Sequence, residues 1–370
     1  MPDARYIMIG GFLGAGKTTA MLRLAEKLVT DGQRVGLITN DQSSGLVDTA
    51  LARASGMPVA EITGGCFCCR FQSLMDAASN LTRESAPEVF LAEPVGSCTD
   101  LRASVAYPLR RLYDDRFSVA PLSVLVDPIR CSRILGLEPG KVFAPKVVYV
   151  YRKQLEEADA IVINKSDLVD ASHLQRLRDA LAREFPHADI LSMSALHSRG
   201  LDPWFERILG SNMASFSAPD LDYEVYAEGE AMLGWLNATV QLANSGPFSG
   251  NRLLEDLTAA IQSQLGAAGA EIAHLKMTLT PDEDSDDIGV INLARGDGTP
   301  FMAHTLSADL ESGQLLINLR AEADPELLYH VVTRVLREVA GRQSKLRVTL
   351  EHSEHFRPAK PVPTYRMAEA

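Results

Sequence analysis

The hydrophobic pattern of the chain changes character near residue 210. Before it, short apolar runs without polar alternation are separated by segments of helical periodicity. Such runs are typical of strands that are buried on both faces of a parallel sheet. They occupy residues 6–9, 35–39, 89–92, 122–126 and 160–163, with a short edge strand at 190–192. We predict an α/β domain over residues 1–210, with a mostly parallel sheet and helices on both faces.

The second half follows a different pattern. Residues 211–221 are small and polar, and we predict that they form a linker. A smaller α+β domain with a mainly antiparallel sheet is expected over residues 222–357, because strand patterns there outnumber helical ones. The proline-containing tail, 358–370, is expected to be extended. The strand patterns lie at 223–228, 233–243, 271–280, 288–293, 301–306, 314–319 and 345–351, and the helical ones at 251–265 and 325–340.

Composition narrows the possible partners and compartment. The formal net charge of -12 over 370 residues argues against non-specific binding to nucleic acid or to an anionic membrane. No stretch approaches the roughly 20 apolar residues of a membrane span. The N-terminus leads directly into the first strand pattern without a signal peptide, so we expect a cytoplasmic protein. Three of the five cysteines fall within four residues, which is unlike a disulfide framework.

A phosphate-binding loop follows the first predicted strand. Residues 11–18 match G-x-x-x-x-G-K-[ST] at every fixed position, which are Gly11, Gly16, Lys17 and Thr18. Gly14 lies within the loop between them. The motif stands between a strand and a helix, which is the context that it requires. Its backbone N–H groups are expected to surround phosphate oxygens, Lys17 to reach the β and γ phosphates, and Thr18 to ligate Mg²⁺. This context disfavours a chance glycine-rich turn.

A guanine-recognition motif closes the strand at 160–163. Asn164, Lys165 and Asp167 fit the N-K-x-D pattern of GTPases. The Asp167 carboxylate would accept hydrogen bonds from guanine N1–H and the 2-amino group, whereas adenine would leave a buried acceptor unpaired. Ser194 and Ala195 occupy the place where GTPases support the base from a backbone N–H. A helix cap is the alternative interpretation, and a small-molecule kinase is disfavoured by the motif.

Two acidic residues are candidates for holding magnesium or the attacking water. Glu93 follows the strand at 89–92 and precedes Gly96, whose N–H could bind the γ-phosphate as in a Walker B and second switch region. Asp48 follows the second strand, as a first switch would. A strand-end carboxylate and a helix cap are the alternatives. We predict that Lys17, Asp48 and Glu93 are the catalytic residues.

The glycine pair at 64–65 precedes a cysteine cluster. Cys66 and Cys69 share a face if a helix begins here, and Cys68 joins them if its start is irregular. Three thiolates suit Zn²⁺ or another thiophilic divalent metal. The fourth ligand is open: water, Glu61, a histidine or a residue of a partner. A redox site or a set of small buried hydrophobic residues are the alternatives.

Other candidates carry weaker patterns. Cys98 lies close to Gly96 and could approach the switch, but we predict that it and Cys131 are ordinary buried cysteines. His352 and His355 could bind metal, but a solvated pair is the favoured interpretation.

These motifs together resemble the CobW-like family of P-loop GTPases, a group regarded as metallochaperones. The signatures are the P-loop extended to Thr19, Asn40-Asp41 with Asp48, the segment from Glu61 to Cys69, Glu93-x-x-Gly96, and Asn164 to Asp167. The resemblance covers about residues 5–210. It implies a sheet of the signal-recognition and nitrogenase-iron-protein class, slow hydrolysis of GTP to GDP and phosphate, and metal near the switches. It also implies nucleotide-controlled association with a partner or a second copy of the chain, that is, a homodimer.

Three features depart from the family pattern. The usual Asn-Glu-Phe-Gly is here 40-Asn-Asp-Gln-Ser-43, and the usual Glu-Thr-Ser/Thr-Gly is 93-Glu-Pro-Val-Gly-96. These two departures lie in the predicted switch segments and therefore affect the expected details of GTP hydrolysis. A histidine-rich loop is missing from the sequence, which weakens a role in zinc storage.

The sequence thus predicts a GTP-binding, GTP-hydrolysing protein that delivers or gates a metal, or a metal-containing cofactor, for a client. The client would be a metalloprotein or a cofactor-dependent enzyme. The alternative is a nucleotide-binding metal sensor without client delivery. Client-stimulated turnover favours the chaperone, and a metal response independent of nucleotide favours the sensor.

Overall fold

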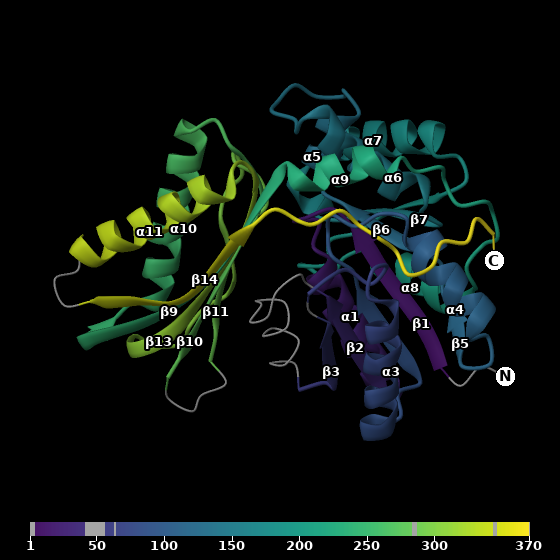
Figure 1. Ribbon diagram of the computed structural model, residues 1–370, viewed down its shortest axis with the longest axis horizontal. Helices are drawn as coiled ribbons and strands as arrows, with labels where there is room; N and C mark the ends of the chain where they lie inside the picture. Colours follow the sequence, from purple (N-terminus) through teal and green to yellow (C-terminus); the bar gives the residue numbers. More distant parts are fainter. Residues whose placement is uncertain (1–3, 41–55, 63, 283–286, 343–345, 370) are drawn as a thin grey trace. The chain divides into compact units, whose positions relative to one another are not determined.

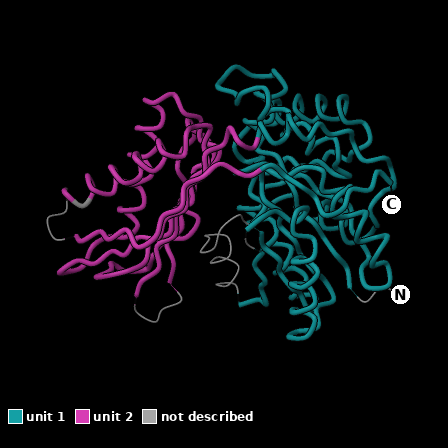
Figure 2. The backbone as a smooth tube through the Cα atoms, in the orientation of Figure 1, with its two compact units in different colours: residues 1–44, 51–229, 360–370 teal, residues 45–50, 230–359 magenta. Residues whose placement is uncertain are grey.

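The computed structural model describes residues 4–40, 56–62, 64–282, 287–342 and 346–369. The described residues up to Gly229 form one compact unit together with the C-terminal segment from Lys360, and residues 230–359 form a second (Figure 2). The predicted linker, residues 211–221, therefore lies within the first unit. Among the described residues, no helix has the length and apolar character needed to cross a membrane.

The first unit is built on a parallel sheet with the order β3-β2-β4-β1-β6-β7-β8, to which β5 adds a short pairing with β1 (Figure 1). This confirms the predicted fold class. The strands are β1 (Ala4–Gly11), β2 (Val35–Asn40), β3 (Val59–Ile62), β4 (Val89–Glu93), β5 (Phe117–Val119), β6 (Ser123–Val126), β7 (Ala160–Ile163) and β8 (Asp189–Ser192). The α-helices are α1 (Lys17–Thr30), α3 (Phe71–Ser85), α4 (Tyr107–Leu112), α5 (Pro128–Ile134), α6 (Pro145–Glu156), α7 (Ala171–Glu184), α8 (Asp202–Gly210) and α9 (Tyr223–Ala231).

Burial on both faces of the sheet explains the unbroken apolar strands. Ile7 and Ile9 of β1 pack in one core with α1 and α8, while Tyr6 and Met8, which point the other way, are buried as well. Helix α1 presents its apolar face to this core at the helical spacing of Met21, Leu24 and Leu28. Because all these strands are parallel, their carboxyl ends meet at one edge of the sheet, and the loops that follow β1, β4 and β7 lie there.

The second unit contains an antiparallel sheet in the order β12-β11-β10-β13-β9-β14. Helices α10 (Gly250–Ala267) and α11 (Pro325–Arg342) cover one face of it and share its core (Figure 1). This agrees with the predicted α+β character. The strands are β9 (Leu233–Phe248), β10 (Glu271–Pro281), β11 (Gly289–Leu293), β12 (Phe301–His304), β13 (Leu310–Glu322) and β14 (Arg347–Phe356).

One predicted strand is wrong. Residues 223–228 belong to helix α9 rather than to a strand. The Asp222 carboxylate accepts hydrogen bonds from the backbone N–H groups of Glu224 and Val225, which satisfies the open helix start. The helix then packs Tyr226 against Val150. The alternation of apolar residues in this segment was therefore misleading.

The predicted linker is held to the first unit by hydrogen bonds. Arg102 donates to the Ala214 carbonyl at 2.8 Å, and the Met213 N–H donates to the Val119 carbonyl at 3.0 Å. Arg102 is fully buried and forms an ion pair with Asp159, with Nη2 and Oδ1 2.8 Å apart. Residues 211–221 thus contribute to the packing of this unit.

Candidate functional site

The loop after β1 has the backbone conformation that a phosphate-binding loop needs. Gly11, Gly14 and Gly16 all have positive φ, which favours glycine. At Gly16, with φ +87°, a Cβ atom would stand 2.5 Å from Asn164 Nδ2. Lys17 and Thr18 are buried at the first turn of α1, and Thr19 beside them is half-buried. The loop is therefore packed closely against the segment that follows β7.

Asn164 joins the phosphate-binding loop to the predicted guanine-binding segments. Its Nδ2 donates to the Ala15 carbonyl at 2.9 Å, and its Oδ1 accepts from the Ala195 N–H at 3.0 Å. The side chain is 2 % exposed. A single buried amide thus fixes the loop after β1 relative to the loop after β8.

Lys165 makes a second connection to the phosphate-binding loop. It has φ +54°, and its Nζ donates to the Gly14 carbonyl at 2.5 Å and to Asp127 Oδ2 at 3.1 Å. Asp127 also caps α5. Asp167 follows in a 3-10 turn, with its carboxylate 3.6 Å from His197 Nε2. Three of the predicted guanine-site residues therefore come together at the carboxyl edge of the sheet.

Ser194 and Ala195 follow β8 and hydrogen-bond within the protein. The Ala195 N–H donates to Asn164, and the Ser194 N–H donates to the Arg199 carbonyl at 2.9 Å. These hydrogen bonds shape the loop that carries His197, a residue that the sequence motifs did not indicate.

Glu93 ends β4 directly beside the phosphate-binding loop. Thr18 Oγ1 donates to Glu93 Oε1 at 3.1 Å, and Lys17 Nζ lies 3.7 Å from the same oxygen. Gly96 is packed so closely on this loop that a Cβ atom would stand 2.9 Å from Leu13 N and 3.0 Å from Lys17 Nζ. The segment after β4 therefore touches the two side chains expected to contact phosphate and magnesium. The other predicted catalytic carboxylate, Asp48, lies outside the described residues.

The hydroxyl of Thr18 and the carboxylate of Glu93 form a hard oxygen donor set, which is the kind that Mg²⁺ prefers. Their direct hydrogen bond places both oxygens at one point beside the phosphate-binding loop. These two residues fit the predicted magnesium site.

Cys66, Cys68 and Cys69 bring their sulfur atoms to one point. Every pair of sulfurs lies within 4.8 Å, with Cys66 and Cys69 3.3 Å apart and Cys68 and Cys69 3.7 Å apart. Sulfur ligands of a tetrahedral Zn²⁺ lie about 3.8 Å apart, since each Zn–S bond is about 2.3 Å. In the part of the chain that the structure describes, these three are the residues that group in this way. The cluster fits a thiophilic metal with small adjustments.

The electrostatics of the cluster favour one thiolate before a metal binds. Hydrogen bonding with the Cys68, Cys69 and Cys98 thiols holds the pKa of Cys66 well below its usual range, although burial opposes this. Hydrogen bonding with the Cys66 thiol raises the pKa of Cys69 to about 11. Cys66 is therefore the group prepared to meet a cation, and a bound metal would have to displace protons from the others.

Asn40 positions the cysteine cluster from the end of β2. Its Nδ2 donates to the carbonyls of Ile62 at 3.0 Å and Gly65 at 2.8 Å, and its Oδ1 accepts from the Phe67 N–H at 3.0 Å. The side chain is buried. The cluster is thus attached to the strand whose end leads into the predicted first switch.

The remaining cysteines separate into two cases. Cys131, in α5, is fully buried away from the cluster, and burial raises its pKa to about 12, as expected of an ordinary buried cysteine. Cys98 differs from that prediction, because its thiol forms hydrogen bonds with the thiols of Cys66 and Cys68. Sequence spacing gave no sign of this, since Cys98 lies 29 positions after Cys69.

The two histidines of β14 do not form a shared site. His352 Nε2 lies 3.3 Å from Glu354 Oε1, and His355 Nε2 lies 3.0 Å from Glu326 Oε1. His355 also stacks on Tyr329, with ring centroids 4.7 Å apart. Each imidazole therefore has its own partners.

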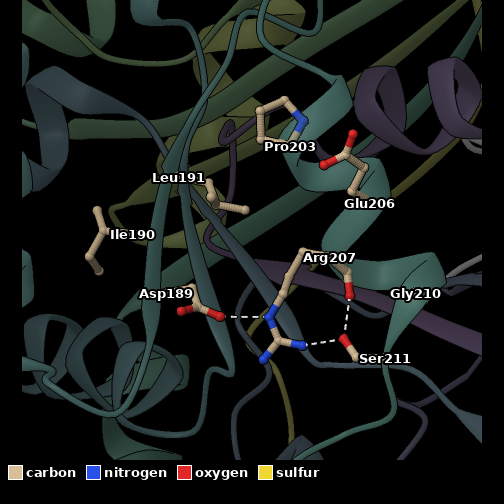
Figure 3. A pocket seen from close by; sticks show the side chains of 8 residues that line it. All are labelled: Asp189, Ile190, Leu191, Pro203, Glu206, Arg207, Gly210 and Ser211. Carbon is tan, nitrogen blue, oxygen red and sulfur yellow. Dashed lines mark hydrogen bonds and ion pairs between the residues drawn. The ribbon is translucent and has the colours of Figure 1, made fainter.

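A surface hollow of about 500 Å³ lies beside β8 and α8 (Figure 3). Arg207 crosses it, with Nε 2.6 Å from Asp189 Oδ2 and Nη1 2.5 Å from Ser211 Oγ. Asp189 is the first residue of β8, whereas the predicted nucleotide residues follow the other ends of the strands. The hollow is therefore separate from the site described above.

Curated proteins match part of this chain in sequence. A zinc chaperone CobW of Sinorhizobium sp is 29 % identical over 47 % of this chain and 54 % of its own length. A zinc chaperone YeiR of Escherichia coli (strain K12) is 32 % identical over 47 % of this chain and 50 % of its own length. The chain thus spans about half the length of these curated relatives.

Solved structures that match this chain include HypB from Helicobacter pylori in complex with nickel, at 20 % identity and a TM-score of 0.41, covering 56 % of this chain and 86 % of that one. The Zn(II)-bound YjiA GTPase from E. coli matches at 13 % identity and a TM-score of 0.36, covering 90 % of this chain and 99 % of that one. The model of the CobW/HypB/UreG nucleotide-binding domain matches residues 5–192, half of the chain. The chain belongs to the CobW/HypB/UreG family.

Proposed function

We propose that this protein is a GTPase that carries Zn²⁺, or another thiophilic divalent metal, as its cargo and delivers or gates it for a client protein. The observation that carries the proposal is the attachment of the cysteine cluster to the nucleotide-binding edge. Asn40, at the end of β2, holds Gly65 and Phe67 on either side of Cys66. The zinc chaperones that resemble this chain over about half their length support the choice of cargo.

The nucleotide site would combine the phosphate-binding and guanine-recognition motifs with two carboxylates. Backbone N–H groups of the loop after β1 and the Lys17 ammonium would hold the phosphates, and the Asp167 carboxylate would accept from the guanine edge. Thr18 and Glu93 would hold Mg²⁺, which neutralises phosphate charge. In hydrolysis, a water oxygen bonds to the γ-phosphorus as the bond to the bridging β–γ oxygen breaks, which gives GDP and phosphate. Glu93 and Asp48 are the proposed groups for holding that water.

Metal binding would proceed at the thiol cluster. Cys66, as the thiolate, would meet the cation first, and Cys68 and Cys69 would lose their protons as they bind. Binding there would stiffen the segment between the two predicted switches. Nucleotide-dependent rearrangement of the switches would then change the hold on the metal.

Two measurements on the purified chain test the proposal. Calorimetry should show much tighter binding of GDP than of ADP, and metal analysis should show one Zn²⁺ per chain. Changing Cys66, Cys68 and Cys69 together to Ser should remove the metal, whereas Cys131→Ser should leave it. Equal affinities for GDP and ADP would overturn the guanine assignment, and metal content that survives the triple change would overturn the cargo site.

Delivery to a client needs a separate measurement. Capture with the chain locked in a GTP state, compared with the nucleotide-free chain, should yield a metal-dependent protein in one state only. Turnover of GTP should rise when that protein is added without its metal. An unchanged rate would leave metal transfer without support.

A further inference from the structure

The second switch region carries a fourth cysteine to the metal site. Cys98 lies five residues after Glu93 and is 2 % exposed. Its thiol forms hydrogen bonds with the thiols of Cys66 and Cys68. The order β3-β2-β4 explains the meeting, because the segment after β3 and the segment after β4 leave the same edge of the sheet. A fourth cysteine therefore lies beside the cluster of three that the family resemblance indicated, although the group whose sulfurs all lie within 4.8 Å of one another consists of Cys66, Cys68 and Cys69.

We propose that Cys98 is the fourth ligand of the metal, which makes the site a four-thiolate one. The proposal rests on the proposed function, since it completes the same cargo site. Cys98 contacts two of the three clustered thiols, and a shift toward Cys69 would close a tetrahedron around a cation. Thiolate is also the donor that a thiophilic metal selects over water or carboxylate.

The backbone around Cys98 is held firmly. Gln154 Nε2 donates to the carbonyls of both Gly96, at 2.9 Å, and Cys98, at 2.8 Å. The next residue, Thr99, donates from its hydroxyl to Glu157 Oε1 at 3.1 Å. Gln154 is itself buried. One side chain of α6 thus makes Gly96 and Cys98 move together.

This connection gives the nucleotide a direct path to the metal. Gly96 packs against Leu13 and Lys17 of the phosphate-binding loop, as its Cβ clearances show. A γ-phosphate that draws the Gly96 N–H toward itself would displace Cys98, two residues further on. The metal would then exchange between a four-thiolate and a three-thiolate site as the nucleotide changes. Release of the cargo follows from the loss of one ligand.

The ligand count can be measured without any substitution. X-ray absorption at the zinc edge of the wild-type chain should show four sulfur neighbours in one nucleotide state. Three sulfurs with one oxygen or nitrogen in both the GDP and the GTP-analogue states would overturn the inference and leave the proposed function intact. A wild-type chain that binds no Zn²⁺ at all would overturn the proposed function itself.

Substitution gives a second test. With Co²⁺ in place of Zn²⁺, Cys98→Ser should lower the sulfur-to-metal charge-transfer absorption by about a quarter and weaken the metal affinity by about tenfold or more. Cys131→Ser is the matched control, because it also changes a buried cysteine but lies outside the cluster. Its spectrum and affinity should equal those of the wild type. A Cys98→Ser spectrum that matches the control would contradict a fourth thiolate.

A separate observation concerns the C-terminal strap, which we define as residues 360–369. It crosses the cysteine cluster in the first unit: the Val362 N–H donates to Cys69 Sγ at 3.2 Å, and the Thr364 N–H donates to the Cys68 carbonyl at 2.8 Å. Thr364 Oγ1 also donates to the Cys69 carbonyl at 3.2 Å. The strap thus covers Cys69, the thiol of the three that is most exposed.

The strap is anchored on the loop that carries Cys98. Arg366 Nε donates to Asp100 Oδ2 at 3.0 Å, and the Tyr223 hydroxyl donates to the same oxygen at 2.5 Å. The Asp100 side chain is 3 % exposed. Tyr365 packs edge-on against Phe71, with ring centroids 5.2 Å apart. A shift of the second switch would therefore act on the strap as well as on the cluster.

We further propose that the strap retains the bound metal, through the hydrogen bond from the Val362 N–H to the Cys69 sulfur. This proposal also rests on the proposed function. An N–H donor stabilises a thiolate ligand and hinders the approach of a competing chelator. Val362 is 71 % exposed, so its side chain adds little packing and its N–H can be removed selectively.

Val362→Pro removes this donor, and Val362→Ala keeps it and serves as the control. Zn²⁺ should pass to a chelator about tenfold faster from the proline variant than from the alanine variant, which should match the wild type. Thermal unfolding of the metal-free chains should show that both variants fold. Equal release rates from the two variants would overturn the strap proposal. A wild-type chain without bound metal would instead refute the cargo site.

Discussion

Replacing Asn164 by alanine probes the connection between the phosphate-binding loop and the guanine-binding loops. The change deletes a donor to the Ala15 carbonyl at 2.9 Å and an acceptor for the Ala195 N–H at 3.0 Å. Ala15 and Ala195 are 2 % and 1 % exposed, so water cannot easily replace the lost partners. Each unsatisfied buried group costs about 1–3 kcal/mol. We expect Asn164→Ala to lower the free energy of unfolding by about 2–6 kcal/mol.

The same change should weaken nucleotide binding in a distinctive way. Without the amide, the two loops must be ordered by the nucleotide itself, so affinities for GDP and ADP should both fall, by about tenfold. Their ratio should stay within about threefold of the wild type, because Asp167 still meets the base. Calorimetry with both nucleotides measures the ratio, and denaturant unfolding measures the stability.

Asn80→Ala serves as the control, since Asn80 is exposed on α3. Its unfolding free energy should change by no more than about 0.5 kcal/mol. An Asn164→Ala protein as stable as this control, with GDP affinity unchanged, would refute the role assigned to the buried amide. A change in the GDP-to-ADP ratio as large as that of Asp167→Asn would show that Asn164 reads the base directly.

Three further predictions concern single groups. Asp167→Asn should reduce the preference for GDP over ADP by about 10–100-fold, since a charged acceptor is lost; calorimetry would refute this with an unchanged ratio. Lys17→Ala should abolish GTP turnover while circular dichroism stays that of the wild type, and retained turnover would move the active site elsewhere. Burial raises the pKa of Glu157 from 4.5 to about 8, so the native state binds more protons between these values, and the unfolding free energy should fall as pH rises through this window. Denaturant unfolding should show that Glu157→Gln lacks this decrease, and equal slopes for the two proteins would contradict it.

Local patterns predicted much of the fold because they follow from burial and from backbone chemistry. The unbroken apolar runs predicted the strands of the parallel sheet. The glycines together with Lys17 predicted the phosphate-binding loop after β1. Strand β5 was missed because three residues give too little periodicity, and β3 was missed because its residues are mostly half-buried and include Glu61, unlike the fully buried apolar runs. Helix α9 was taken for a strand because capping by Asp222 outweighs an alternating pattern.

The parts of the site that sequence reasoning missed depend on contacts between distant segments. Asn40 holds the cysteine cluster, Gln154 holds the second switch, and Val362 covers Cys69. Gln154 and Val362 belong to no motif, and the motif that contains Asn40 does not reveal its contact with the cysteine cluster. Cys98 was taken for an ordinary buried cysteine, since only strand order brings it to Cys66. Spacing reveals ligands that share one helix turn, whereas ligands on separate loops require the topology.

The claim that nucleotide controls the hold on the metal can be tested with one pair of titrations. Zn²⁺ affinity should be measured by chelator competition on the chain saturated with a non-hydrolysable GTP analogue and on the chain saturated with GDP. Because Cys98 and Gly96 are braced by the same Gln154 side chain, the two affinities should differ by about 5–150-fold. Zn²⁺ should in turn change the preference for the GTP analogue over GDP by the same factor. Identical Zn²⁺ affinities in the two nucleotide states would contradict the coupling and leave a nucleotide-binding protein that merely holds a metal.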